Sequence, residues 1–134
     1  MRNLRRRVES ERGSSVVEFV LVAPLLVGVA LVVLQFALAL HVRSTMTAAA
    51  AEGARVAALA GSQLDMGERR TRELLDGNLA ASLVTSIRAT RVVEHGIVMT
   101  RVQIEARLPL LGMLGPASMN VTGHALQELS LIHI

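Results

Sequence analysis

The sequence predicts an α+β fold, in which a long N-terminal helix is followed by a short second helix and a small three-stranded antiparallel sheet. Three patterns predict it. An uncharged run from Phe19 to Leu40 is apolar apart from Gln35, leucines then recur every four residues, and the C-terminal third alternates apolar with polar residues. The 134 residues are 51% hydrophobic but only 1% aromatic, so the core must be aliphatic. This composition suits one small domain joined to an apolar segment.

The apolar run has the length of a membrane span. Its 22 residues would extend about 33 Å as a helix, enough for a hydrocarbon core of about 30 Å. Pro24 and Gly28 lie inside it, and membrane helices tolerate both residue types. We favour a retained transmembrane helix over two alternatives, a signal peptide cleaved after Ala39 and a buried helix of a soluble protein. The run is longer than a usual signal peptide, and the remaining chain is too small to cover it.

The positive charge of the chain lies entirely in residues 1–13. This leader has a net charge of +3, and residues 14–134 contain nine arginines and nine acids. The positive-inside rule therefore places the N-terminus in the cytoplasm and the C-terminal domain outside, as a single-pass protein of the cytoplasmic (inner) membrane. Without a basic patch or stacking aromatics on the folded domain, we expect no nucleic-acid partner. The arginines that form this topology signal are Arg2, Arg5, Arg6, Arg7 and Arg12.

The segment "RGSSVVEF" at residues 12–19 resembles the processing site of type IV prepilins. In that family a short basic leader ends in glycine, a prepilin peptidase cleaves after the glycine, and the fifth mature residue is glutamate. The matching residues here are Gly13, Ser14 and Glu18. The resemblance therefore implies cleavage between Gly13 and Ser14. Many type IV pilins begin the mature chain with Phe or Met, so N-methylation is not carried over to Ser14.

A second motif narrows the resemblance. "RGSSVVEF", an early Pro24 and "AAAAEGARVAALAG" at residues 48–61 together resemble the TadE-like proteins, which are pseudopilins of tight-adherence pilus systems. The resemblance covers about residues 11–61. It implies a structural role in pilus assembly and cell adhesion, and a pilin-like fold for the part outside the membrane. The partners that it implies are the lipid bilayer, a prepilin peptidase, other pilin or pseudopilin subunits and the assembly machinery. The subunit would stay in the membrane or enter an extracellular pilus.

Glu18 has two compatible interpretations. Cleavage would give Ser14 a free α-amino group, positively charged near neutral pH. The resemblance implies that Glu18 of one subunit meets this amine of its neighbour, and such a pair is strong where the dielectric is low. Alternatively, Glu18 lies at the depth of the lipid headgroups, near a helix N-terminus whose dipole favours an anion.

The long helix is expected to span residues 14–60, with the transmembrane part at 19–40. Small residues from Ala48 onward would let other helices approach closely, and Glu52 and Arg55 are spaced to form an ion pair. Gly61-Ser62 should end the helix. A second helix is expected from Met66 to Leu83, with Asp65 and Glu68 at the spacing of a capping box. Its apolar stripe would consist of Leu75, Leu79 and Leu83.

Three strands should complete a small extracytoplasmic domain at residues 61–128. The segment from Ile87 to Glu94 is a weaker strand, and His95-Gly96 is expected to form a hairpin turn. "TRVQIEARL" and "ASMNVTGHA" alternate as half-buried strands do, with Val102, Ile104, Ala106 and Val121 among the inward residues. "LPLLGMLGP" would be an apolar loop. The final "LSLIHI", residues 129–134, breaks the pattern, so we interpret it as a non-native tail and expect no function for it.

The sequence contains no recognisable constellation for catalysis. It has no cysteine, its four histidines are scattered, and no glycine-rich phosphate loop is present. We therefore expect neither an enzyme nor a metal or cofactor site. The main alternative to a pilus subunit is a signal-anchored membrane protein whose outer domain binds a ligand or partner.

Overall fold

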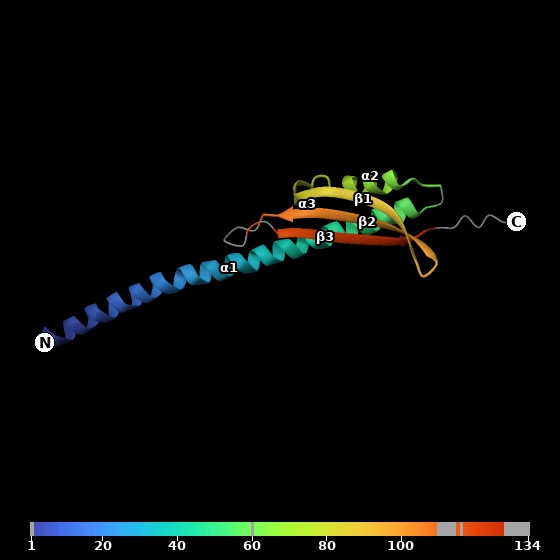
Figure 1. Ribbon diagram of the computed structural model, residues 1–134. Helices are drawn as coiled ribbons and strands as arrows, with labels where there is room; N and C mark the ends of the chain where they lie inside the picture. The colour runs from blue at the N-terminus through green and yellow to red at the C-terminus, as the bar shows by residue number, and fades with distance from the viewer. Residues whose placement is uncertain (1, 60, 110–114, 116, 128–134) are drawn as a thin grey trace. The chain divides into compact units, whose positions relative to one another are not determined.

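The computed structural model describes residues 2–59, 61–109, 115 and 117–127, and the side chains from residue 13 onward within these ranges. Three helices precede three strands: α1 (Arg2–Ala58), α2 (Leu64–Leu75), α3 (Leu79–Leu83), β1 (Val84–Glu94), β2 (Ile97–Leu108) and β3 (Ala117–Leu126) (Figure 1). The predicted α+β class, with a long helix and a three-stranded antiparallel sheet, is confirmed. Most of the "LPLLGMLGP" loop and all of the "LSLIHI" tail lie outside the described residues.

The chain divides into two compact units, residues 1–38 and 39–134, and the division falls within α1. The first unit is helical throughout its described residues. In the second unit, burial begins at Val42, directly after the predicted membrane segment. The structural unit that contains the sheet therefore includes the alanine-rich end of the long helix, rather than the sheet alone.

Helix α1 begins at Arg2, whereas the predicted helix began at residue 14. At the other end it stops at Ala58, two residues before the expected limit. Gly61 has a φ of +78°, a conformation that glycine adopts without strain, and the Ser62 N–H donates to the Leu59 carbonyl at 3.1 Å. The predicted helix stop at Gly61-Ser62 is therefore confirmed.

The expected single helix from Met66 to Leu83 is wrong, since it is divided into α2 and α3. Gly77, with a φ of +79°, follows the end of α2, and the Asn78 side chain donates to the Leu74 carbonyl at 3.1 Å. The continuous leucine stripe is wrong for the same reason. Leu75 is buried on α2, whereas Leu79 at the start of α3 is 57% exposed.

The predicted capping box at the start of this helix is also wrong. The N-cap residue is Gln63, whose side chain makes no capping hydrogen bond. Asp65 instead accepts a hydrogen bond from Arg69 at 2.8 Å, one turn along α2. Glu68 accepts one from the backbone N–H of Ala89 on β1 at 2.8 Å, so this side chain joins a helix to the sheet.

The sheet has the order β1-β2-β3, with both neighbouring pairs antiparallel (Figure 1). The predicted hairpin turn is confirmed, because His95 and Gly96 both have positive φ values, +54° and +78°. The first strand begins at Val84, three residues earlier than expected, and its register is irregular between Val84 and Ser86. The register of β2 with β3 is continuous from Met99↔Leu126 to Leu108↔Ala117.

One face of the sheet packs on α1 and forms the core. The predicted inward residues of β2 and β3 are buried or half-buried, and the buried ones belong to the same core cluster as the buried side chains of α1. Their neighbours Glu105, Arg107, Asn120 and Thr122 are exposed, as the alternation predicted. The buried residues that carry this contact are Val102, Ile104, Ala106 and Val121 on the sheet, and Val42, Met46, Ala50 and Ala54 on α1.

Three glycines set how closely the elements approach one another. A Cβ on Gly123 of β3 would lie 2.5 Å from the Ala50 carbonyl oxygen of α1. A Cβ on Gly67 of α2 would lie 2.6 Å from the Gly53 carbonyl oxygen of α1, and one on Gly53 would collide with Thr71. These contacts leave no room for a side chain, so β3 and α2 pack directly against the backbone of α1.

Candidate processing and membrane segment

The residues predicted for processing, Gly13 and Ser14, and for subunit pairing, Ser14 and Glu18, lie on α1 and are exposed. Gly13, Ser14 and Glu18 follow one another within little more than one helical turn. Residues three or four apart face the same side of a helix, so Ser14 and Glu18 lie on one side of α1. The arginines predicted as the topology signal belong to the N-terminal backbone of α1, and their side chains lie outside the described part of the chain.

The fold gives no packing reason for glycine at position 13. A Cβ placed there would meet nothing within 4 Å, and the residue lies within a helix, without a positive φ. Glycine in a helix interior costs about 1 kcal/mol relative to alanine. Gly13 therefore differs from Gly53, Gly67 and Gly123, which are required where segments pack closely.

Glu18 has no hydrogen-bond or ion-pair partner among the side chains that the structure describes. It is exposed, at the start of the apolar part of α1. The side chains that the structure describes therefore do not supply the cation that an acidic group in a low-dielectric environment requires.

Large apolar side chains surround α1 on all sides after Glu18. Phe19 is 72% exposed, Leu25 67% and Phe36 67%, and comparable values extend to Leu40. One helix among the described residues, Gly13–Ala58, is long and apolar enough to cross a membrane. An apolar surface of this extent, exposed around a whole helix, requires lipid or other subunits to cover it.

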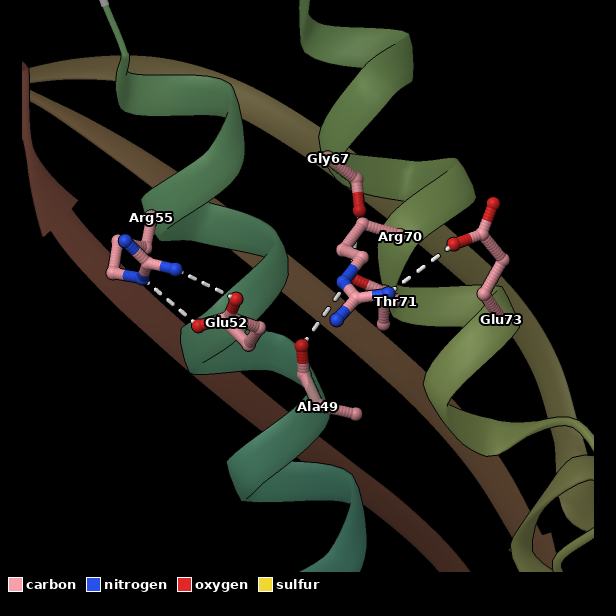
Figure 2. Close-up of polar contacts among 7 residues, drawn as sticks. All are labelled: Ala49, Glu52, Arg55, Gly67, Arg70, Thr71 and Glu73. Carbon is pink, nitrogen blue, oxygen red and sulfur yellow. Dashed lines mark hydrogen bonds and ion pairs between the residues drawn. The ribbon is translucent and has the colours of Figure 1, made fainter.

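The "EGAR" segment lies at the crossing of α1 and α2 (Figure 2). The predicted pair of Glu52 and Arg55 is confirmed, with two hydrogen bonds at 2.8 and 2.9 Å. The hydrogen bond from the Arg55 side chain lowers the pKa of the Glu52 carboxyl below its ordinary value of 4.5, and the charges of Arg55 and Arg70 act in the same direction, against a smaller opposing effect of burial.

Gly53, the next residue in the segment, faces α2. The Thr71 hydroxyl donates to the Gly67 carbonyl at 2.8 Å and lies 3.5 Å from the Ala49 carbonyl of α1 (Figure 2). Thr71 is fully buried, so these carbonyls satisfy a hydroxyl that has no access to solvent.

Residues 13–55 match the family model of TadE-like proteins. This segment of the chain is similar to TadE-like proteins. The match begins at Gly13 and ends at Arg55, so it includes the glutamate, the apolar run and the "EGAR" segment that carried the resemblance. No curated protein and no solved structure matches the chain. The TadE-like match and the candidate membrane helix together support a membrane-anchored, pilus-associated protein.

Sequence reasoning missed two contacts in this region. The crossing of α1 with α2 depends on Ala49, Gly53 and Ala57, whose spacing of four residues is the signal that could have located it. The bond from Ala89 to Glu68 had no signal in the sequence, because it joins residues 21 apart in the chain. Among the described residues, no group of three His, Asp or Glu side chains could hold a metal ion.

Proposed function

We propose that the chain is a TadE-like pseudopilin, made as a membrane-inserted precursor and cleaved after Gly13 by a prepilin peptidase. Its role is structural, in the biogenesis of a tight-adherence pilus at the cytoplasmic membrane. The observation that carries the proposal is the family match at residues 13–55, which begins at the glycine itself. The exposed Gly13, which no packing contact requires, supports a role in processing rather than in folding.

In this proposal the leader and the apolar helix have successive roles. The arginines of residues 1–13 orient the precursor with its N-terminus in the cytoplasm and are then removed. The apolar part of α1 holds the mature subunit in the bilayer until it contacts other pilin or pseudopilin subunits. The domain that contains the sheet stays outside the membrane and supplies contacts with those subunits.

The test is the intact mass of the chain isolated from cells that process their own prepilins. The expected mature chain begins at Ser14. A chain that begins at residue 40 would identify a secreted domain released by signal peptidase, and a full-length chain would identify a signal-anchored protein. Either of these results would overturn the proposal.

Gly13→Ala should block the cleavage, because the peptidase is expected to require the leader glycine. Gly28→Ala is the matched control, since Gly28 is also an exposed helical glycine, and a Cβ added there would meet nothing within 4 Å. Equal processing of the two variants would show that Gly13 is not the cleavage residue.

A further inference from the structure

The two edges of the sheet differ in how they are protected. On β1, the Ala89 N–H points away from β2, and Glu68 of α2 accepts its hydrogen bond. This strand also has an irregular register at Val84 and Ser86 and carries charged side chains, including Arg88 and Glu94. Irregularities, charges and a covering helix are the features by which natural sheets prevent other strands from pairing with an edge. The β1 edge is therefore closed.

Within the described residues, the β3 edge has none of these features. Its ten residues, "ASMNVTGHAL", include no charged residue and no proline, and its register with β2 is continuous. Among the described residues, β3 pairs with β2 alone. A long, regular and uncharged edge of this kind is a template for an additional strand.

The register identifies the backbone groups that face outward from β3. Because Ala89 directs its N–H away from β2, its partner Val102 directs its own N–H and C=O toward β3, where it pairs with Gly123. These directions alternate along a strand. The outward-directed amide groups of β3 are therefore those at even positions, Ser118, Asn120, Thr122 and His124.

The flank of α1 beside this edge offers space for the side chains of an added strand. The Ala50 and Ala51 backbone contacts Gly123 of β3. Beyond Ala51, an open groove of about 500 Å³ extends over the same flank of α1. Its lining residues are mainly small, and α2 packs against the opposite flank, through Ala49 and Gly53. The groove is lined by Leu40, Arg43, Ser44, Thr47, Ala48 and Ala51.

We propose that the β3 edge is a docking site for an extended strand of a second, different protein. Backbone hydrogen bonds to Ser118, Asn120, Thr122 and His124 would hold this strand. Its side chains alternate between the polar outer face of the sheet and the small-residue flank of α1. Arg43 lies on that flank and has no ion-pair partner within the part of the chain that the structure describes, so the strand should carry an acidic residue toward it.

A second copy of this chain fits the edge less well, an argument that rests on the proposed membrane anchor. Two identical edges pair through a two-fold axis, which makes their strands antiparallel. Figure 1 shows that β3 points in the same general direction as residues 39–58 of α1, so these helical segments would also become antiparallel. The two Ala39 ends, to which the apolar segments are joined, would then lie at opposite ends of the six-stranded sheet, and this arrangement disfavours two chains anchored in one membrane.

The test uses the full-length chain in the cells that make it, with photoreactive p-benzoylphenylalanine at Asn120, Thr122 or His124 in separate variants. The same probe at Thr90, an exposed residue of β1 at the closed edge, is the control. Crosslinked peptides are identified by mass spectrometry. We expect the three β3 probes to react with one segment of another protein, at sites that shift by about two residues per step, and the Thr90 probe to react with none of it.

A backbone variant then separates strand pairing from mere proximity. Thr122→Pro removes an outward N–H that β2 does not use, whereas Thr122→Ala keeps it. Crosslinking from Asn120 should fall about tenfold or more in Thr122→Pro and stay unchanged in Thr122→Ala. Should Thr122→Pro fail to fold, Thr122→Lys places a charge on the open edge without altering the backbone, and Thr90→Lys is its control.

Three results would overturn the proposal. They are crosslinks to a second copy of this chain, the absence of periodic crosslinks, and equal crosslinking in the compared variants, which are Thr122→Pro with Thr122→Ala or Thr122→Lys with Thr90→Lys. Failure of this test would leave the proposed function intact, because cleavage at Gly13 is measured separately by intact mass. An unprocessed chain that still gives periodic crosslinks would overturn the proposed function alone.

Discussion

At the scale of the residue, the described glycines that lack a positive φ fall into two groups. Gly53, Gly67 and Gly123 lie where a Cβ would collide with a neighbouring backbone or side chain, whereas Gly13 and Gly28 have open space around them. The first group determines how closely α2 and β3 approach α1. The second group has no such structural role, so a substitution in each group should affect a different property of the protein.

Gly123→Ala is expected to destabilise the domain that contains the sheet by about 1 to 3 kcal/mol, the usual cost of overpacking. The added methyl group would lie 2.5 Å from the Ala50 carbonyl oxygen, and the α1 backbone cannot move aside without disturbing the core. Chemical denaturation of the full chain in detergent measures the effect. Thr122→Ala changes the neighbouring residue, whose side chain is exposed to solvent, and should be nearly neutral. Equal stabilities of the two variants would contradict the prediction.

Glu52 should make stability depend on pH in the acid range. Its pKa is lowered mainly by the hydrogen bond from Arg55, so the folded state favours the ionised carboxylate. Its contribution is therefore present above the ordinary pKa of 4.5 and is lost as the pH falls through the lower folded value. The melting temperatures of the unaltered chain and Glu52→Gln should converge below that range. A constant difference from neutral to acid pH would contradict this assignment.

At the scale of the element, the strands were easier to predict from the sequence than the helices of the domain. A period of two residues identified the inward side chains of β2 and β3, because one face of the sheet is buried and the other is solvated. The predicted helix from Met66 to Leu83 failed at Gly77. The leucine spacing continues past that glycine, but the helical backbone does not, because a residue with a positive φ ends a helix whatever residues follow it.

The predicted capping box failed for a different reason. Asp65 and Glu68 have the spacing that such a motif requires, but Glu68 is turned toward the sheet and accepts a hydrogen bond from Ala89. Contacts between residues distant in the sequence leave no local sequence pattern. A side chain whose spacing predicts a capping hydrogen bond can therefore bond to a distant segment instead. The open edge of β3 was equally invisible, because an edge is defined only by the order of the strands.

Glu68→Ala is expected to destabilise the domain by about 1 to 2 kcal/mol, because the Ala89 N–H would lose its hydrogen-bond acceptor at a largely buried position. Glu68→Gln keeps an acceptor oxygen and should recover much of this stability. Hydrogen exchange provides the specific readout, since the Ala89 amide should exchange faster in Glu68→Ala and change less in Glu68→Gln. An unchanged exchange rate at Ala89 in both variants would show that the bond does not persist in solution.

At the scale of the whole molecule, the N-terminal part could be interpreted more fully from the sequence than the domain that contains the sheet. The spacing of Gly13, Glu18 and "EGAR" is local, and residues 13–55 do match the TadE-like family. The function of the domain that contains the sheet depends on surfaces assembled from distant residues. In particular, the crossing at Gly53 and Gly67 links the "EGAR" segment to α2, so part of the segment that matches the TadE-like family model also belongs to the core of the domain that contains the sheet.

Glu18 supplies the prediction that belongs to the assembled protein rather than to the isolated chain. It has no partner among the described side chains, yet it lies at the start of an exposed apolar helix. If the Ser14 amine of a neighbouring subunit is its partner, Glu18→Gln should leave membrane insertion and cleavage intact and sharply reduce assembly. Loss of one member of a buried ion pair typically costs about 3 to 5 kcal/mol, which would weaken a subunit contact by a factor of about one hundred to several thousand.

The measurement compares two quantities in the same cells: the mature chain in membranes, by intact mass, and the pili per cell, by electron microscopy. Glu18→Asp is the control, because it keeps the negative charge with a side chain one methylene shorter, and should reduce assembly less than Glu18→Gln. Normal piliation in Glu18→Gln would show that the carboxylate only occupies the headgroup region, where the helix N-terminus is sufficient to stabilise it. Loss of the cleaved chain itself would instead assign Glu18 to recognition by the peptidase, before any subunit contact forms.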